Sequence, residues 1–159
     1  MEIEFDVKIT TNILYDYMLQ HTYSRLPGLM GTLVGVLMLF LFAANRQPLI
    51  LIIAVVILFY LPWTLFLRAA SQAKTTPAFQ KPLHYRLSEE GIEVSQDETT
   101  EQMAWEGMVK AISTPKSIVI YTTAVNACIF PKSDLGDSKY KVIEMISTHM
   151  PPKKVKIRG

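Results

Sequence analysis

The sequence predicts an α+β membrane protein, in which a two-helix transmembrane hairpin is joined to an antiparallel β-barrel or sandwich that is closed by a C-terminal helix. Two observations lead to this prediction. Two uncharged apolar runs follow one another in the first half of the chain, and each has the roughly 20 residues that a helix needs to cross a ~30 Å hydrocarbon core. After these runs the apolar period changes to two, with turn residues about every 8–12 positions, before a final helical pattern.

The composition agrees with a single domain that carries membrane segments. The chain has 159 residues, of which 50% are hydrophobic and 19% are charged, whereas globular domains average about 25% charged residues. A net charge of +2 creates no strong overall field, so no nucleic-acid partner is expected. A single cysteine excludes a disulfide framework and a cysteine-rich metal site.

Residues 1–25 predict a cytoplasmic strand and helix that precede the membrane. Apolar and charged residues alternate from Ile3 to Ile9, which is typical of a half-buried strand. Thr10 or Thr11 can then cap a helix. Because a lone strand leaves its edges unpaired, we expect this strand to pair with strands from the C-terminal part of the chain, across the hairpin.

Residues 26–68 form the predicted transmembrane hairpin, with spans at about 27–45 and 48–67. Both spans are free of charged residues and apolar on every face, unlike the amphipathic helices that cover a globular core. Pro48 suits the first turn of the second span, where no backbone N–H is needed. A buried helical hairpin in a soluble protein is the alternative, but a small domain could not cover two such helices on all sides.

The distribution of lysine and arginine predicts the orientation of the hairpin. The link between the spans carries one basic residue, Arg46, whereas the other ends are flanked by Lys8, Arg25, Arg68, Lys74, Lys81 and Arg86. Basic residues collect on the cytoplasmic side of a membrane, so both termini are expected in the cytoplasm. Anchors at the inner interface of the membrane are expected at Tyr60, Trp63 and Arg68.

Three glycines, Gly28, Gly31 and Gly35, lie along the first predicted span. Gly31 and Gly35 form a GxxxG pair, which lets helix backbones approach closely. We expect these glycines to pack against another helix, either the second span or a helix of a second copy. Glycine is also common in membrane helices that lack this role.

The rest of the chain predicts a linker followed by a β-rich domain. Residues 69–82 are small and polar with two prolines, as in a flexible or extended connection. The domain at residues 83–159 has strand patterns around 83–87, 92–94, 103–113, 117–122 and 127–130. A last helix follows, with Asp137 or Ser138 as its N-cap, and one face is expected to carry Tyr140, Ile143, Ser147 and Met150, with Val142 and Ile146 beside it. Strands followed by one closing helix are the plan of a pleckstrin-homology-like (PH-like) barrel.

The order of strand, helix, two spans and β domain resembles the YcxB-like proteins. The stretches that carry this resemblance are HYRLSEEGIEVSQ and MAWEGMVKAISTPKSIVIYTTAVNACIFPKSDL. Within them the most telling pieces are Gly91-Ile92 after paired glutamates, Trp105-Glu106, Tyr121 and Pro131-Lys132. The resemblance implies a multi-pass protein of the bacterial cell (inner) membrane with a PH-like cytoplasmic domain, and it supplies no functional residues.

The sequence predicts no catalytic residue, no cofactor site and no metal site. His21, His84 and His149 lack the spacing of metal ligands, and no nucleophile, phosphate-binding or dinucleotide motif is present. Cys128 lies between apolar neighbours and is expected to be a buried thiol rather than a nucleophile. Trp105 is expected in the core rather than as a binding anchor. We therefore expect no enzyme and no small-molecule substrate.

Two functions agree with these features. In the first, a non-enzymatic membrane protein presents its cytoplasmic module as a protein-binding or regulatory adaptor, with a protein partner or self-association in addition to the lipid bilayer. In the second, the chain is an anionic-lipid surface sensor that uses its basic tail, Lys153, Lys154, Lys156 and Arg158, because each basic residue near an anionic leaflet gains about 1 kcal/mol. A solvated, frayed terminus is the alternative for this tail. A transporter is disfavoured because the spans are uncharged.

Overall fold

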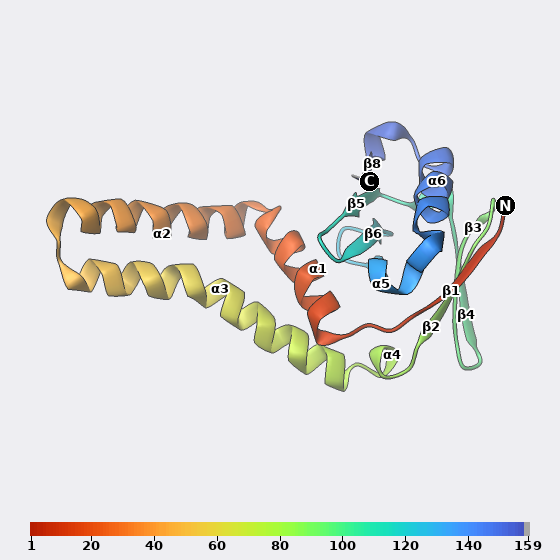
Figure 1. Cartoon of the computed structure of the whole chain (residues 1–159), viewed down its shortest axis with the longest axis horizontal. Helices are drawn as coiled ribbons and strands as arrows, with labels where there is room; N and C mark the ends of the chain where they lie inside the picture. Colours follow the sequence, from red (N-terminus) through yellow and green to blue (C-terminus); the bar gives the residue numbers. More distant parts are fainter. Residues whose placement is uncertain (158–159) are drawn as a thin grey trace.

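A helical hairpin projects from one side of a two-sheet domain in the computed structural model, which describes residues 1–157 (Figure 1). The hairpin consists of α2 (Leu26–Asn45) and α3 (Pro48–Thr75), which lie side by side. Proline stands in the first turn of both helices, where its missing N–H costs no hydrogen bond. Arg46 between them adopts a left-handed conformation, with φ of 56°, and so reverses the chain.

The first sheet contains strands from both sides of the hairpin. Its order is β1 (Ile3–Val7), β2 (Leu83–Leu87), β3 (Gly91–Gln96) and β4 (Thr99–Ala104), with every pair antiparallel. In β1 the residues are alternately buried and exposed, as its alternating sequence predicts. The expectation that the leader strand pairs with the C-terminal part is confirmed, because β1 lies beside β2 with Phe5 opposite Tyr85.

The second sheet has the order β7 (Ala127–Pro131), β6 (Ser117–Tyr121), β5 (Lys110–Ser113) and β8 (Val155–Lys156). Strands β5, β6 and β7 are antiparallel, whereas β8 runs parallel to β5. The two sheets share one core: the Phe5 ring meets the Phe130 ring edge to face at 5.2 Å, and Tyr85 meets Phe130 at 4.9 Å.

Helices close the remaining sides of the domain. Helix α1 (Thr11–Tyr23) begins after Thr10, whose hydroxyl accepts a hydrogen bond from the Ile13 N–H, as the sequence predicts. Short segments α4 (Pro77–Gln80), η1 (Trp105–Gly107), α5 (Lys132–Leu135) and η2 (Gly136–Ser138) lead to α6 (Lys139–His149), and η3 (Pro152–Lys154) precedes β8. The buried residues of α6 are Val142, Met145 and Ile146. The predicted face is wrong at Tyr140, which is 71% exposed. The buried face of α6 is instead centred on Val142, Met145 and Ile146, which point to a different side of the helix than Tyr140 does.

The hairpin helices are long and apolar enough to span a membrane. In the most apolar 18-residue window of each helix only 11% of the residues are buried. A core helix of a soluble domain would be mostly buried, whereas these helices present apolar side chains such as Phe40 and Phe59 to their surroundings.

The predicted linker at residues 69–82 is helical over most of its length, which differs from the expected flexible connection. Helix α3 continues to Thr75, and α4 follows at once. Alanine, glutamine and lysine are good helix formers, and Ala69 is fully buried. Tyr15 of α1 also packs edge to face on Phe66 of α3 at 5.5 Å, so the hairpin is joined to the domain by packed helix.

The expected barrel is not closed. The described residues form two separate four-stranded sheets, because the chain turns at Trp105 and Val109 into the second sheet instead of extending the first. Strand β4 pairs with β3 on one side only, and its side chains are mostly exposed, so β4 is a free edge of the first sheet. The α+β class and the antiparallel sheets are confirmed, whereas the PH-like arrangement stays a prediction.

The three glycines of α2 lie against two different partners. A Cβ on Gly28 would lie 2.4 Å from the backbone oxygen of Thr22, at the junction of α1 and α2. A Cβ on Gly31 would lie 3.4 Å from Leu61, and one on Gly35 would lie 2.5 Å from Leu58, both on α3. The GxxxG pair therefore faces the other helix of the same hairpin.

We expect Phe5→Ala to lower the free energy of unfolding by about 3–5 kcal/mol, because it removes a core ring that joins the two sheets. Glu4→Gln, at the neighbouring exposed position, is the control and should change the free energy by less than about 1 kcal/mol. Urea unfolding of the full chain in detergent, followed by tryptophan fluorescence, measures both. Equal effects of the two substitutions would show that β1 is not part of the core.

We expect Gly28→Ala to destabilise the chain by about 1–3 kcal/mol, because its new methyl group meets backbone that cannot rotate away. Gly107→Ala is the matched control, since a Cβ there meets nothing within 4 Å. Thermal unfolding in detergent, monitored by circular dichroism, compares them. If the two variants unfold at the same temperature, the close approach of α1 and α2 is absent.

Candidate functional site

A groove of about 500 Å³ lies between the two sheets and joins several elements; it is here called the inter-sheet groove. Residues of β4 and β7, which belong to different sheets, both line it. Its walls come from both sheets, from α1 and from the end of α3, and its lining includes Tyr17, Gln72, Tyr85, Glu101, Val125 and Cys128. The groove thus lies at the meeting point of the domain and the hairpin helices.

At the bottom of the inter-sheet groove, the Cys128 thiol and the Tyr85 hydroxyl are buried among apolar side chains and keep their protons at neutral pH. Burial raises the pKa of the Cys128 thiol to about 11, and the negative charge of Glu101 adds to this rise while Tyr85 opposes it. Burial also raises the pKa of the Tyr85 hydroxyl. A thiol with this pKa carries almost no thiolate at neutral pH, so Cys128 is a poor nucleophile. Its predicted burial is confirmed, with 6% of the residue exposed.

The rim of the inter-sheet groove is acidic and borders a free strand edge. Glu101 lies on β4, and the β3–β4 turn next to it carries Asp97 and Glu98. Asp97 is paired with Lys81 at 2.7 Å, whereas Glu98 and Glu101 form no ion pair with any residue of the range 1–157. Strand β4 pairs with β3 on one side only, and the unpaired backbone groups of an edge strand can accept a further strand.

Sequence reasoning missed Glu101 as a groove residue. The alternating pattern contained the signal, because Glu101 and Met103 stand two apart and therefore share one face of β4, and both line the groove. Glu101 was missed because a charged residue in an alternating strand is normally expected on the face that points to solvent.

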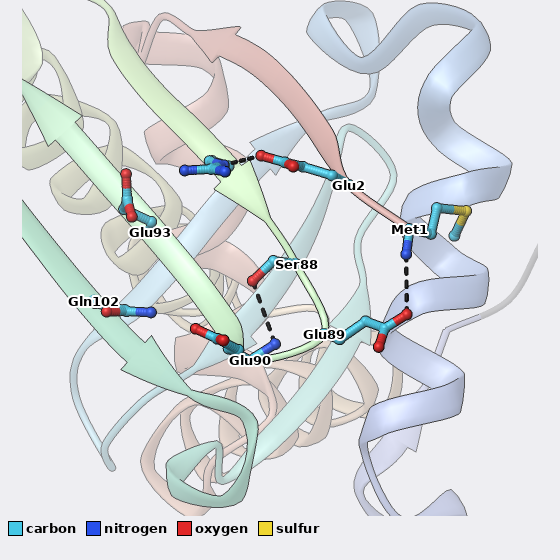
Figure 2. Close-up of a pocket in the computed structure, with 8 residues that line it drawn as sticks. Met1, Glu2, Ser88, Glu89, Glu90, Glu93 and Gln102 are labelled. Carbon is cyan, nitrogen blue, oxygen red and sulfur yellow. Dashed lines mark hydrogen bonds and ion pairs between the residues drawn. The ribbon is translucent and has the colours of Figure 1, made fainter.

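A second hollow, of about 350 Å³, lies on the outer face of the first sheet and is surrounded by four glutamates (Figure 2). The Arg86 guanidinium is hydrogen-bonded to Glu2, and the amino group of Met1 pairs with Glu89 at 3.0 Å. These contacts lower the pKa of both carboxyl groups. The remaining glutamates, Glu90 and Glu93, are solvated, so this hollow contains an exposed charge network and no buried polar group.

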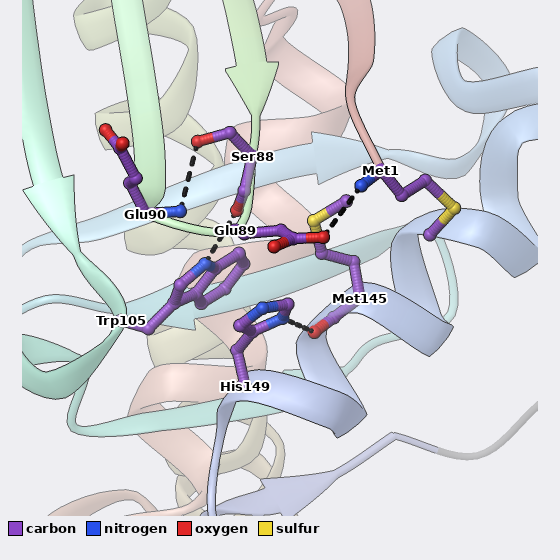
Figure 3. A network of polar contacts seen from close by, with 7 residues as sticks. All are labelled: Met1, Ser88, Glu89, Glu90, Trp105, Met145 and His149. Carbon is purple, nitrogen blue, oxygen red and sulfur yellow. Dashed lines mark hydrogen bonds and ion pairs between the residues drawn. The ribbon is translucent and has the colours of Figure 1, made fainter.

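Trp105 and His149 join the first sheet to α6 beside this hollow (Figure 3). The Trp105 indole N–H donates to the Ser88 carbonyl at 2.9 Å, and its ring stacks on His149 at 5.4 Å. His149 Nδ1 lies 2.9 Å from the Met145 carbonyl, so Nδ1 carries the proton. Trp105 is 5% exposed. The core position predicted for Trp105 is confirmed, and this network fixes the β2–β3 turn against the closing helix.

A third polar cluster joins α1 to β6. His21 Nδ1 lies 3.1 Å from the Tyr121 hydroxyl, and the Lys110 ammonium lies over the Tyr121 ring at 4.5 Å. Burial lowers the pKa of His21, and the nearby charges of Arg25 and Lys110 lower it further. Arg25 also donates to the Ala124 carbonyl at 2.8 Å. The cluster is therefore positively charged.

The predicted site residues do not form one site. Gly28, Gly31 and Gly35 line no part of the inter-sheet groove. The three predicted interface anchors, Tyr60, Trp63 and Arg68, are all exposed on α3. Among residues 1–157, no group of three or more His, Cys, Asp and Glu side chains is placed to hold a metal ion.

The basic tail is more ordered than a frayed terminus. The Lys154 ammonium donates to the Met108 carbonyl at 2.9 Å, and Lys156 lies in β8 beside β5. Lys153 is exposed in η3. The predicted contact at Arg158 lies outside the described residues.

Comparison with known proteins gives one finding. A family model described as YcxB-like protein matches residues 87–141, from the end of β2 into α6. No curated protein and no solved structure matches this chain. The matched segment contains Trp105, Tyr121, strands β3 and β4 of the first sheet and strands β5, β6 and β7 of the second. The resemblance predicted from the sequence is therefore confirmed: the chain carries the YcxB-like pattern over residues 87–141.

Proposed function

We propose that this chain is a non-enzymatic protein of the bacterial inner membrane that anchors a PH-like cytoplasmic module and uses the inter-sheet groove to bind an extended, basic peptide segment of a partner protein. The observation that carries the proposal is the free edge of β4 beside an apolar groove with an acidic rim. An added strand gains backbone hydrogen bonds from such an edge, and alternate side chains enter the groove.

Membrane anchoring is supported by the exposure of α2 and α3. Few of their apolar residues are buried, and in water this surface would be costly, whereas in lipid it is the stable arrangement. The β1–β2 pairing holds both ends of the hairpin on one side. The basic residues near those ends, Arg25, Arg68 and Lys74, support a cytoplasmic domain.

A binding role is favoured over catalysis by the chemistry of the groove. Its thiol is protonated, and its one carboxylate, Glu101, is exposed and has no histidine among its neighbours in the lining. Glu101 instead suits the recognition of a cation. Together with Glu98 it makes the groove complementary to a lysine or arginine side chain, which is why we assign a basic segment as the occupant.

The proposal is tested by selecting binders from a random linear peptide library on the full chain in nanodiscs. We expect the selected peptides to alternate apolar residues with lysine or arginine. Glu101→Gln should weaken these peptides about two- to five-fold, because an exposed ion pair contributes up to about 1 kcal/mol.

The matched control is Glu144→Gln, which removes the same charge from an exposed position on α6 and lines no part of the groove. It should weaken the selected peptides less than Glu101→Gln does. Peptides without basic residues, or peptides that bind equally to both variants and to the parent chain, would contradict the proposal.

A further inference from the structure

A hollow of about 480 Å³ lies between the C-terminal end of α1 and the strands β5 and β8, here called the membrane-facing hollow. Its lining consists of Gln20, Ser24, Lys110, Ile112, Ser113 and Lys156. The volume is within the range of about 300–1,000 Å³ that small-molecule sites occupy. Its side chains are hydrogen-bond donors and cations, with a single apolar residue among them.

The membrane-facing hollow contains positive charge without a compensating carboxylate. Neither Lys110 nor Lys156 forms an ion pair with any residue of the range 1–157, and no acidic side chain lines the hollow. The acid one turn earlier on α1, Asp16, instead accepts a hydrogen bond from the Lys116 backbone N–H at 3.3 Å. Lys110 lies near Arg25 and His21 in the cluster described above, which strengthens the positive potential.

The membrane-facing hollow lies close to the start of α2, the first helix of membrane length. Ser24 ends α1, and Leu26 begins α2, the first membrane-length helix. Two peptide units separate these residues, so their Cα atoms are at most about 8 Å apart. In Figure 1 β5 and β8 lie beside the end of α1 that leads into α2. With α2 in the membrane, as proposed above, a group bound in the hollow would lie at about the depth of the lipid headgroups.

We propose that the membrane-facing hollow binds the phosphate of an anionic phospholipid headgroup. Lys110 and Lys156 provide the charge, and Ser24 and Gln20 provide neutral donors to the phosphate oxygens, while the Ser113 hydroxyl donates to the Thr114 carbonyl at 3.4 Å. The Gln20 side-chain amide donates to the Ser24 hydroxyl oxygen at 3.1 Å, and this hydrogen bond fixes both side chains at the rim of the hollow. This inference rests on the membrane anchoring in the proposed function and is independent of the peptide groove.

The binding site differs from the lipid contact that the sequence predicts for the tail. The Lys154 ammonium donates to the Met108 carbonyl, and Lys153 is exposed and lines no part of the hollow. Of the tail lysines, Lys156 alone lines the hollow. The partner that completes the site, Lys110, comes from β5 and carries no sequence signal, because a single lysine at a strand start is ordinary.

The test is a lipid titration of the full chain in detergent, monitored by native mass spectrometry, with phosphatidylglycerol and phosphatidylcholine of the same acyl chains as probes. We expect phosphatidylglycerol to bind more tightly than phosphatidylcholine. Lys110→Gln with Lys156→Gln should weaken phosphatidylglycerol roughly ten-fold or more, because each lysine near an anionic headgroup contributes several-fold. Lys110→Arg with Lys156→Arg should retain binding, which guards against a loss caused by misfolding.

The matched control is Lys116→Gln with Lys141→Gln, which removes the same charge from two exposed lysines outside the hollow. Equal weakening by both double variants, or no preference for phosphatidylglycerol, would overturn the inference. Displacement of the lipid by glycerol 3-phosphate at similar concentration would overturn it as well, in favour of a soluble anion. Recovery of the parent chain in carbonate-washed membranes separates the two proposals: loss of membrane association contradicts the anchoring itself, whereas retention without lipid preference contradicts this site alone.

Discussion

The antiparallel pairing of β1 with β2 is the contact on which the rest of the structure depends. β1 precedes the hairpin and β2 follows it, with Ile3 opposite Leu87 and Val7 opposite Leu83. Because neighbouring strands lie about 4.7–4.9 Å apart, the two ends of the hairpin must return to the same side of the domain. The hairpin is therefore an insertion within one folded unit. The Phe5 side chain of β1 extends into the core, where its ring contacts both Tyr85 and Phe130 and so joins the two sheets.

The same insertion makes the hairpin helices part of the proposed binding surface. Helix α3 has 28 residues, which is about two turns more than a bilayer requires. Its last turns pack on the domain and contribute Gln72 to the inter-sheet groove, while α1 contributes Tyr17. Tyr17 also donates to the Val125 carbonyl at 3.4 Å, across the groove wall. Helix α3 thus contributes both to the hairpin and to the groove wall, and the membrane-facing hollow lies at the C-terminal end of α1.

The pattern of neighbouring residues in the sequence predicted most helices and strands, but it could not predict which distant segments pack together. The uncharged spans, the alternation in β1 and the Thr10 cap each depend on neighbouring residues, so the sequence showed them directly. The continuation of α3 through Ala69 was missed, because small polar residues fit both a linker and a helix until a packing partner such as α1 is known. The open edge of β4 and the parallel pairing of β8 depend on which strands meet in space. For the same reason, Lys110 beside Lys156 could not be recognised as part of a site from sequence.

The most direct test of the central claim is disulfide formation between β1 and β2 in native membranes. Glu4→Cys and Arg86→Cys place thiols at directly opposite positions on the exposed face, in a background where Cys128→Ala removes the native thiol. A protease site in the α2–α3 link allows detection, because the two fragments stay together only when the disulfide has formed. The account predicts that this pair is oxidised readily, whereas Glu4→Cys with Gln102→Cys, three strands apart and separated by about 14 Å, is not. Fragments that separate without reductant in the first pair, or equal yields from the two pairs, would contradict the inserted hairpin.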